Sequence, residues 1–190
     1  MSLQGTQTEK NLLKAFAGES QARNRYTFFA EQARKEGLVQ IAAIFEETAN
    51  QETEHAKRFF KFLKGGEVEI TAKFPAGTIA TTGENLKRAA EGEHCEWSEL
   101  YPAFAKTARQ EGFEAVAKVF EAVSVAEKGH EERYKAFGDM IDGNEVFSRS
   151  EKVQWRCRTC GYLHEGPEAP AACPACAQSK EVFEVKLGWL

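Results

Sequence analysis

The chain contains an internal repeat whose two copies align without a gap. Residues 26–55 align onto residues 101–130 at a constant offset of 75, and twelve of the thirty aligned positions are identical. Each copy carries one glycine after a polar stretch, at Gly37 and Gly112, where a helix can end and its partner can turn back. The repeat therefore predicts two antiparallel helix pairs.

Apolar residues recur at alternating steps of three and four through both copies, which is typical of helices with one buried face. Thr81 and Glu84 have the spacing of a capping box at the start of a third helix, and Pro102 is expected to kink that helix. We predict an all-α four-helix bundle in which residues 65–82 form the one long connection. The predicted helices cover residues 8–36, 38–64, 83–111 and 113–142.

Each copy of the repeat also carries the sequence Glu-x-x-His, as Glu52 with His55 and as Glu127 with His130. On a helix this spacing places the carboxylate and the imidazole on one face. Two such helices that face each other would bring two carboxylates and two imidazoles into one small volume. This arrangement is typical of metal sites in helical bundles.

Three further acids, Glu19, Glu93 and Glu96, fall on the predicted inner faces of the first and third helices. A single core glutamate is often a salt-bridged structural residue, so each alone has a purely structural alternative. With Glu52 and Glu127 there would be five buried charges, and each costs several kcal/mol unless it is compensated. Two metal ions would compensate them. Carboxylates with one or two imidazoles favour iron or manganese over structural zinc.

A second chemical unit lies near the end of the sequence, in residues 153–190. Two Cys-x-x-Cys knuckles, separated by twelve residues, predict a tetrathiolate metal site. The segment is too short for a self-sufficient hydrophobic core, so a bound metal is expected to hold it folded. Spacing alone suits a zinc ribbon as well as an iron site, but the Cys-Gly-Tyr and Cys-Pro-x-Cys contexts favour iron. The four ligands are Cys157, Cys160, Cys173 and Cys176.

Together these motifs resemble the rubrerythrin family over the whole chain. The resemblance implies a ferritin-like di-iron domain in residues 1–146, a linker in 147–152 and a small irregular, partly β, rubredoxin-like iron domain in 153–190. It also implies that Tyr26 and Tyr101 are hydrogen-bonded near the carboxylates. The residues that match the family pattern are Glu19, Glu52, His55, Glu93, Glu96, Glu127, His130 and the four cysteines.

The resemblance further implies a peroxidase that takes part in oxidative-stress defence. Hydrogen peroxide would be reduced to water at the two irons, and the tetrathiolate iron would deliver electrons from an NAD(P)H-dependent reductase or a rubredoxin. Glu96 and His55 would exchange at one iron, and Tyr26 and Tyr101 would assist catalysis. A homodimer is expected. The alternatives are a ferritin-like ferroxidase that handles iron, and a zinc-ribbon interaction protein whose bundle metals serve stability.

Composition excludes several other classes of function. The formal net charge is −4 and the sequence pI is about 5.7, which argues against nucleic acid or an anionic membrane as a partner. The sequence shows no apolar signal-peptide core and no apolar run of membrane-spanning length, so we expect a cytoplasmic protein. Cys95 lies between Glu93 and Glu96 in sequence, and we expect it to be a free thiol rather than a ligand.

Overall fold

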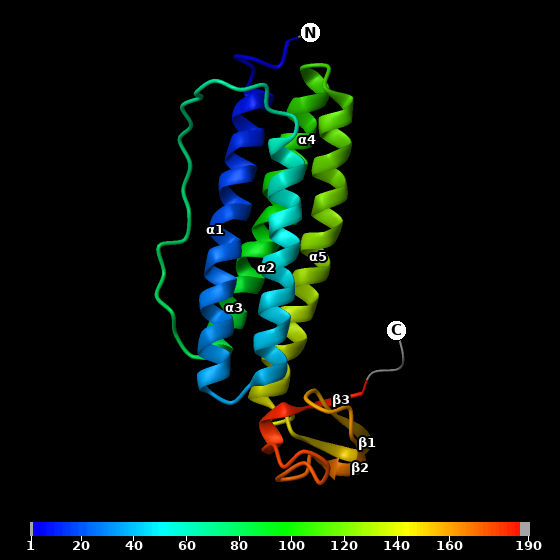
Figure 1. Cartoon of the computed structure of the whole chain (residues 1–190). Coiled ribbons are helices and arrows are strands. Elements are labelled where there is room, and N and C mark those ends of the chain that lie inside the picture. Colours follow the sequence, from blue (N-terminus) through cyan, green and yellow to red (C-terminus); the bar gives the residue numbers. More distant parts are fainter. Residues whose placement is uncertain (1, 187–190) are drawn as a thin grey trace.

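The protein is a four-helix bundle with a small β domain at one end (Figure 1). The computed structural model describes residues 2–186. Helices α1 and α5 run in one direction, and α2 and the continuous α3–α4 rod run in the other (Figure 1). The helices are α1 (Gln7–Lys35), α2 (Val39–Phe60), α3 (Thr82–Cys95), α4 (Tyr101–Gln110) and α5 (Glu114–Asp142).

The capping box and the two glycine turns that the sequence predicted are all present at helix ends. The Thr81 hydroxyl accepts a hydrogen bond from the Glu84 backbone amide, and the Glu84 carboxylate accepts one from the Thr81 amide, so the capping box opens α3. Gly37 and Gly112 have positive φ angles of 75° and 82°. In both turns the amide that follows the glycine donates to a carbonyl five residues earlier, at 2.8 and 2.7 Å. The two copies of the repeat therefore turn back in the same way.

The third predicted helix is interrupted where we expected only a kink at Pro102. A π-helical turn, Glu96–Leu100, joins α3 to α4, and the Tyr101 amide donates to the Glu96 carbonyl. Pro102 has no amide hydrogen, so it cannot supply the next helical hydrogen bond. The irregularity therefore lies immediately before the proline, and a π turn adds one residue to a helix.

The added residue is also visible as a change in the alignment offset between the two copies of the repeat. Before the π turn the two copies match at an offset of 74, and after it they match at 75. Glu19 thus corresponds to Glu93, and Ala22 corresponds to Glu96. The identical pairs at an offset of 74 are Thr8/Thr82, Asn11/Asn85, Leu12/Leu86, Ala15/Ala89, Gly18/Gly92 and Glu19/Glu93.

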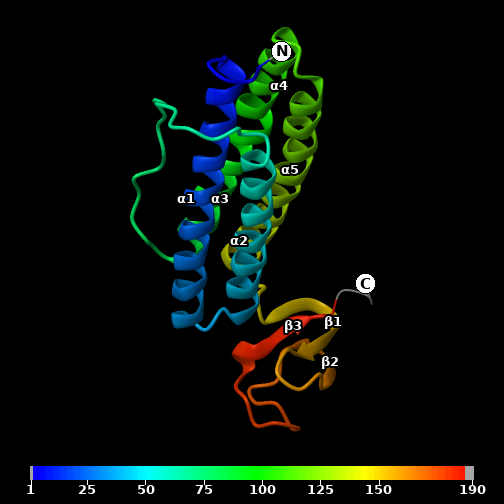
Figure 2. The same ribbon diagram turned by 45° about the horizontal axis from the view of Figure 1, so that its top comes forward.

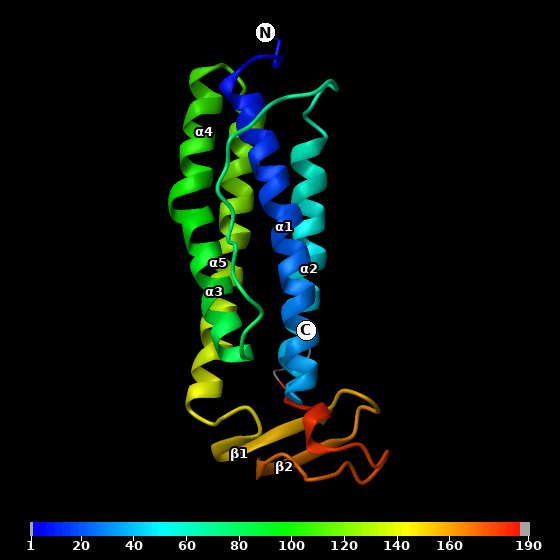
Figure 3. The ribbon, with the colours of Figure 1, turned by 90° about the vertical axis from the view of Figure 1, so that its left-hand side faces the viewer.

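The long connection covers residues 61–81, because α2 ends at Phe60 and not at residue 64 as predicted. It contains no helix or strand beyond the turn that ends α2. It runs the length of the bundle beside α1, and in the side view it lies in front of the gap between α1 and the α3–α4 rod (Figures 1 and 3). The helix pairs α1–α2 and α3–α4–α5 are thus joined by one extended strap.

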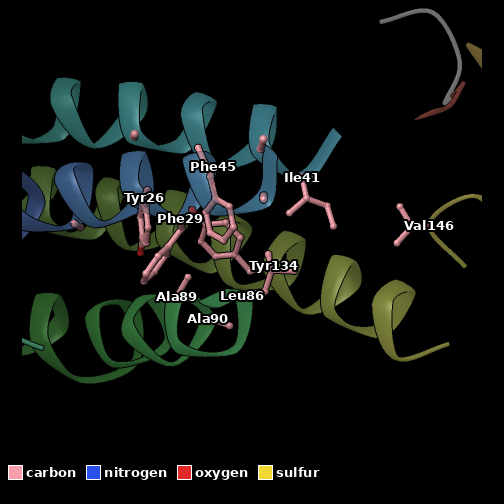
Figure 4. Packing of buried hydrophobic residues seen from close by; sticks show 14 residues of the cluster. Tyr26, Phe29, Ile41, Phe45, Leu86, Ala89, Ala90, Tyr134 and Val146 are labelled. Carbon is pink, nitrogen blue, oxygen red and sulfur yellow. The ribbon is translucent and has the colours of Figure 1, made fainter. Parts of the chain in front are cut away.

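Two aromatic clusters fill the core, one on each side of the predicted acidic layer. The cluster nearer the β domain includes Tyr26, Phe45 and Tyr134, which are fully or almost fully buried (Figure 4). The Phe45 and Tyr134 ring centroids are 5.2 Å apart, and in the other cluster those of Phe120 and Phe59 are 5.0 Å apart. These residues correspond in the repeat. Each buried aromatic contributes on the order of 1.5–3 kcal/mol, which helps to offset the cost of burying acids between them.

The C-terminal domain is a three-stranded antiparallel sheet of order β2-β1-β3. The strands are β1 (Ser148–Cys157), β2 (Leu163–Glu168) and β3 (Phe183–Val185), with a 3-10 turn at Lys180–Val182. Strand β1 begins inside the segment that we predicted as a linker, because Ser148 already pairs with Glu168. The sheet lies at the end of the bundle where α1 meets α2 (Figure 2). No helix within residues 2–186 is long and apolar enough to cross a membrane.

Candidate metal centres

Six of the seven predicted bundle ligands converge in the middle of the four helices, between the two aromatic clusters. They form two overlapping groups, and within each group the ligand-type atoms lie within 4.8 Å of one another. All six side chains are buried or nearly so, with His55 the most exposed at 17%. One group contains Glu19, Glu52, His55 and Glu127, and the other contains Glu52, Glu93, Glu127 and His130.

Glu52 and Glu127 belong to both groups, and each divides its two oxygens between the two histidines. For Glu52, Oε2 lies 2.9 Å from Nδ1 of His55 and Oε1 lies 3.2 Å from Nδ1 of His130. For Glu127, Oε1 lies 2.9 Å from Nδ1 of His55 and Oε2 lies 2.8 Å from Nδ1 of His130. A carboxylate placed between two imidazoles in this way has the geometry needed to bridge two metal ions.

The donor atoms of this cluster fit metal ions better than they fit one another. Buried oxygens of Glu19, Glu52, Glu93 and Glu127, together with Nδ1 of His130, have no hydrogen-bond partner among the described residues. Several of these atoms are within ion-pair distance of one another without forming a hydrogen bond. Buried polar atoms without partners are rare and costly. Two cations in these positions would satisfy them.

Without metal, the cluster balances its charge with protons. Burial raises the pKa of Glu93, against the effect of His130, to about 8. Burial would also raise the pKa of Glu52, but the neighbouring His130 and His55 outweigh it and lower the pKa to about 2. Burial lowers the pKa of both histidines, whereas Glu127 and Glu52 raise them more, to about 10 for His55 and about 12 for His130. Metal ions would displace these protons.

Two tyrosines connect the cluster to the aromatic cores on either side. The Tyr26 hydroxyl donates a hydrogen bond to Oε1 of Glu93, and the Tyr101 hydroxyl donates one to Oε1 of Glu19. Both tyrosines are buried. The two contacts correspond in the repeat, so a tyrosine of each half of the bundle is bonded to a buried glutamate of the other half.

Glu96 is the one predicted bundle ligand that belongs to neither group. Its Oε1 and the Phe74 ring lie 3.8 and 3.9 Å from the point where a Cβ on Gly18 would stand. The side chain therefore extends toward α1 and the strap, where Gly18 leaves room for it. Burial raises its pKa well above the ordinary value, and the Glu93 and Glu127 charges add to this effect. Cys95 is exposed and belongs to neither group, and its role as a free thiol stays a prediction.

Sequence analysis missed the residues that support His130 from behind. Nε2 of His130 lies 3.0 Å from Oε1 of Gln51. Arg133 donates from Nη2 to Oε1 of Gln51 at 3.3 Å and to the Thr48 hydroxyl at 2.6 Å, and from Nη1 to Glu47 at 2.8 Å. When Nε2–H of the neutral ring donates to Gln51, the lone pair of Nδ1 is left free to bind a metal ion.

One more support holds the π turn. The indole Nε1 of Trp97 donates to the buried carboxylate of Glu131, which also lies 3.1 Å from Nδ1 of His94. The segment that carries Glu96 is thereby attached to α5. Helical periodicity could not reveal these contacts, because they join side faces of neighbouring helices rather than the core stripe.

The four cysteines come together in the C-terminal domain. Their sulfurs all lie within 4.8 Å of one another, with Cys157 and Cys176 at 3.8 Å and Cys160 and Cys173 at 3.6 Å. The cluster packs against Trp155, whose side chain is fully buried. This is the closed four-sulfur arrangement that a tetrahedral metal requires.

Backbone amides surround these sulfurs. The residue after each knuckle, Gly161 or Ala177, has a positive φ of 78° or 58°, so the chain folds back over the cysteines. The amide of Tyr162 hydrogen-bonds to the Cys160 sulfur. Burial would raise the pKa of Cys173, but bonds from the amides of Ala175 and Cys176 contribute to lowering it to about 7. Such amides stabilise thiolates and are found around electron-transfer iron sites.

Comparison with known proteins agrees with both centres. Residues 10–138 match the family model "Rubrerythrin", and residues 155–184 match "Rubrerythrin, rubredoxin-like domain". The rubrerythrin of Nitratidesulfovibrio vulgaris is 58% identical over 97% of this chain and 96% of its own length. A structure of nigerythrin in its fully reduced, all-ferrous state superposes with a TM-score of 0.64 at 35% identity, over 98% of this chain and 89% of that one. A Desulfovibrio desulfuricans bacterioferritin shares the bundle fold, with a TM-score of 0.62 at 23% identity over 73% and 82% of the two chains.

Proposed function

Because the chain belongs to the rubrerythrin family, we propose that it reduces hydrogen peroxide to water at the di-iron site in its bundle. The chain has both parts of the family's metal inventory, a di-iron site in a ferritin-like domain and a rubredoxin-like four-cysteine site. Each turnover would consume one peroxide, two electrons and two protons and would release two waters. The observation that carries this proposal is the pair of carboxylates, Glu52 and Glu127, that each span both histidines.

The bundle residues divide the work as follows. Glu52 and Glu127 would bridge the irons, and Glu19 and Glu93 would be terminal ligands, each held by a tyrosine hydroxyl. When bound, the irons supply two electrons and an open position for the oxidant. Tyr26 and Tyr101 hold protons on hydroxyls that already contact these carboxylates, which places them to serve as proton donors.

His55 and Glu96 are proposed to be alternative ligands for the same iron. His55 lies between the two bridging carboxylates, while Glu96 lies outside and faces Gly18. The harder ferric ion favours a carboxylate, and the ferrous ion accepts a neutral imidazole more readily. Glu96 would therefore serve the oxidised site and His55 the reduced one.

The four-cysteine iron is proposed to pass electrons to the bundle. It would receive them from an NAD(P)H-dependent reductase or a rubredoxin. Within one chain the four-cysteine domain lies beyond the end of the bundle (Figure 1), and the aromatic cluster nearer that domain lies between it and the carboxylates. A homodimer in which this domain docks against the neighbouring bundle would shorten the path, and we propose that assembly.

The test separates the two centres. The double variant Cys157→Ser/Cys160→Ser should lose the visible absorption of the ferric tetrathiolate yet keep its di-iron site. After chemical reduction it should still consume one peroxide per di-iron site, while NADH-driven turnover through a reductase should collapse. Cys95→Ser is the matched control, since Cys95 belongs to neither centre, and it should behave as the unmodified protein.

Two results would contradict the proposal. NADH-driven turnover that survives loss of Cys157 and Cys160 would remove the C-terminal iron from the electron path. An unmodified protein that oxidises and retains added ferrous iron, but does not consume peroxide at the expense of NADH, would favour the iron-handling alternative.

A further inference from the structure

A cavity of about 500 Å³ opens between α1, the π turn and residues 71–75 of the strap. The size is within the usual range for sites that bind small organic molecules. Two residues of the candidate site, Glu96 and Tyr101, line it. Because the Tyr101 hydroxyl contacts Glu19, the inner wall of the cavity is also a wall of the metal site.

The lining of this cavity is largely apolar. Ala15, Phe74, Pro75, Leu100 and Phe104 all contribute to it. Hydrogen peroxide is a small polar molecule that gains nothing from such a surface, since apolar lining favours ligands that bury carbon. A ligand that fits this cavity therefore carries an apolar body.

Three of the four charged residues in the lining are cationic. Lys14, Arg25 and Lys73 line the cavity, and Glu96 is the one acid among the residues that line it. Nε of Arg25 is buried and has no hydrogen-bond partner among the described residues. This excess of positive charge is local, because the whole chain carries a net charge of −4. The cavity thus favours a ligand that combines an anionic group with an apolar body.

We propose that this cavity binds an organic hydroperoxide with a carboxylate head group, which the site then reduces. This inference rests on the proposed function. The O–O bond of ROOH breaks, two electrons arrive through the four-cysteine iron, two protons are taken up, and ROH and water leave. Lys14 is one helical turn, about 6 Å, from Gly18, beside which Glu96 lies. One aromatic ring between the two ends of the ligand spans this distance, as in cumene hydroperoxide with a para carboxylate.

Binding is tested with the unreactive parent compound, 4-isopropylbenzoate, and the full-length iron-loaded protein. Calorimetry should show saturable binding of the acid and at least tenfold weaker binding of its methyl ester. Lys14→Glu/Lys73→Glu should weaken binding of the acid at least tenfold. The matched charge change Lys118→Glu/Lys152→Glu, at exposed positions outside this cavity, should leave it unchanged. Equal binding of acid and ester, or no binding of either, would overturn the proposal.

Turnover is tested with 4-carboxycumene hydroperoxide and hydrogen peroxide side by side. Ala72→Trp places a large ring in the cavity from the exposed strap, without touching the helical core. It should lower the ratio of kcat/KM for the organic hydroperoxide to kcat/KM for hydrogen peroxide at least tenfold. An unchanged ratio would overturn the inference. If 4-isopropylbenzoate binds as expected and neither peroxide is consumed, the proposed function fails and the assignment of the cavity as a carboxylate-binding site stands.

Discussion

The two halves of the bundle descend from one repeat but hold their histidines differently. His130 has 8% of its side chain exposed, and its Nε2 is bonded to Gln51, which Arg133 holds in turn. His55 is 17% exposed, and within residues 2–186 its hydrogen bond and ion pairs involve only Nδ1. In the repeat, Gln51 aligns with Ala126, which has no amide to offer.

The difference shows how a site built from two matching halves can have two unlike metal positions. Each half has a Glu-x-x-His motif, a further buried glutamate and a tyrosine. His130 has a hydrogen-bond partner on its outer nitrogen, and His55 has none among the described residues. The acid without a counterpart, Glu96, aligns with Ala22. A hydrogen bond from the outer ring nitrogen fixes the orientation of an imidazole. The ligand exchange proposed above therefore assigns the replaceable position to His55.

The largest effect is expected where the halves are equivalent. Glu127→Ala and Glu52→Ala each remove a carboxylate that contacts both histidines, so each should lose iron from the bundle and should lower the thermal midpoint. Metal analysis is the measurement, with the four-cysteine iron as an internal reference. A Glu127→Ala protein that retained two bundle irons would show that the carboxylate does not bridge, and unequal losses would show that the bridges are not equivalent.

Removing the unmatched acid should affect rate more than binding. Glu96→Ala makes the third helix resemble the first, so the variant should keep ferrous iron but should be oxidised by peroxide at least tenfold more slowly. His55→Ala should instead weaken the ferrous state. Rapid mixing of each reduced variant with hydrogen peroxide, followed by di-ferric absorbance, measures both. If Glu96→Ala reacts as fast as the unmodified protein, Glu96 is not an exchangeable ligand.

Removal of metal should make stability depend on pH. In the folded metal-free protein the pKa of Glu93 is about 8 and that of His55 about 10, both above their values in an unfolded chain. Between about pH 4.5 and 10 the folded state then binds more protons. Its free energy of unfolding should fall as pH rises, by about 1.4 kcal/mol per pH unit for each extra proton.

Glu52 has the opposite sign, because its pKa is lowered to about 2, and its contribution is lost as pH falls through that value. Metal-free protein should therefore be most stable near pH 5. Iron replaces the protons, so loaded protein should show a much flatter profile. Urea unfolding at pH 5, 7 and 9 on both forms is the measurement. A metal-free protein equally stable at pH 5 and pH 9 would contradict the assignment.

Loss of the Gln51 contact with His130 should weaken metal binding less than loss of a bridging carboxylate. The same contact can also be introduced behind His55. Gln51→Ala gives position 51 the alanine found at the matching position 126, and it should weaken metal binding about 10- to 100-fold. Gln51→Glu keeps a hydrogen-bond acceptor for Nε2 of His130 and should retain most of the metal affinity. Ala126→Gln offers His55 a similar partner and should slow its exchange with Glu96. Cobalt(II) titrations followed by visible absorption report both affinity and ligand geometry. Identical spectra and affinities for Gln51→Ala and the unmodified protein would remove Gln51 from the site.

The smallest effect is expected in the aromatic cores. Tyr134 corresponds to Phe59, yet its buried hydroxyl has no hydrogen-bond partner among the described residues. Tyr134→Phe should therefore leave the free energy of unfolding unchanged or raise it by about 1 kcal/mol. Denaturant unfolding at pH 7 gives the value. A loss of more than about 1 kcal/mol would mean that the hydroxyl has a partner after all.

The sequence allowed prediction of the features that follow from periodicity. The two helix pairs, the capping box at Thr81 and the inward direction of Glu19, Glu52, Glu93 and Glu127 all depend on which face of a helix a residue occupies. The direction of Glu96 could not be predicted in this way, because it depends on the π turn and on the space above Gly18. The change of repeat offset from 74 to 75 would have located that turn. Contacts such as Gln51 with His130 depend on the rotation of one helix against another, which periodicity does not fix.

The arrangement of the strap has one further consequence. Helix α1 packs extensively against α2, and α5 against α3 and α4, while direct contacts between the two pairs are few. The carboxylates and imidazoles lie across that interface, between the two aromatic clusters that also join the pairs. If a protease cut the exposed residues 71–75, it would leave two helical hairpins whose reassociation iron would strengthen. The bundle irons would then also hold two separate fragments together, because their proposed ligands come from both helix pairs.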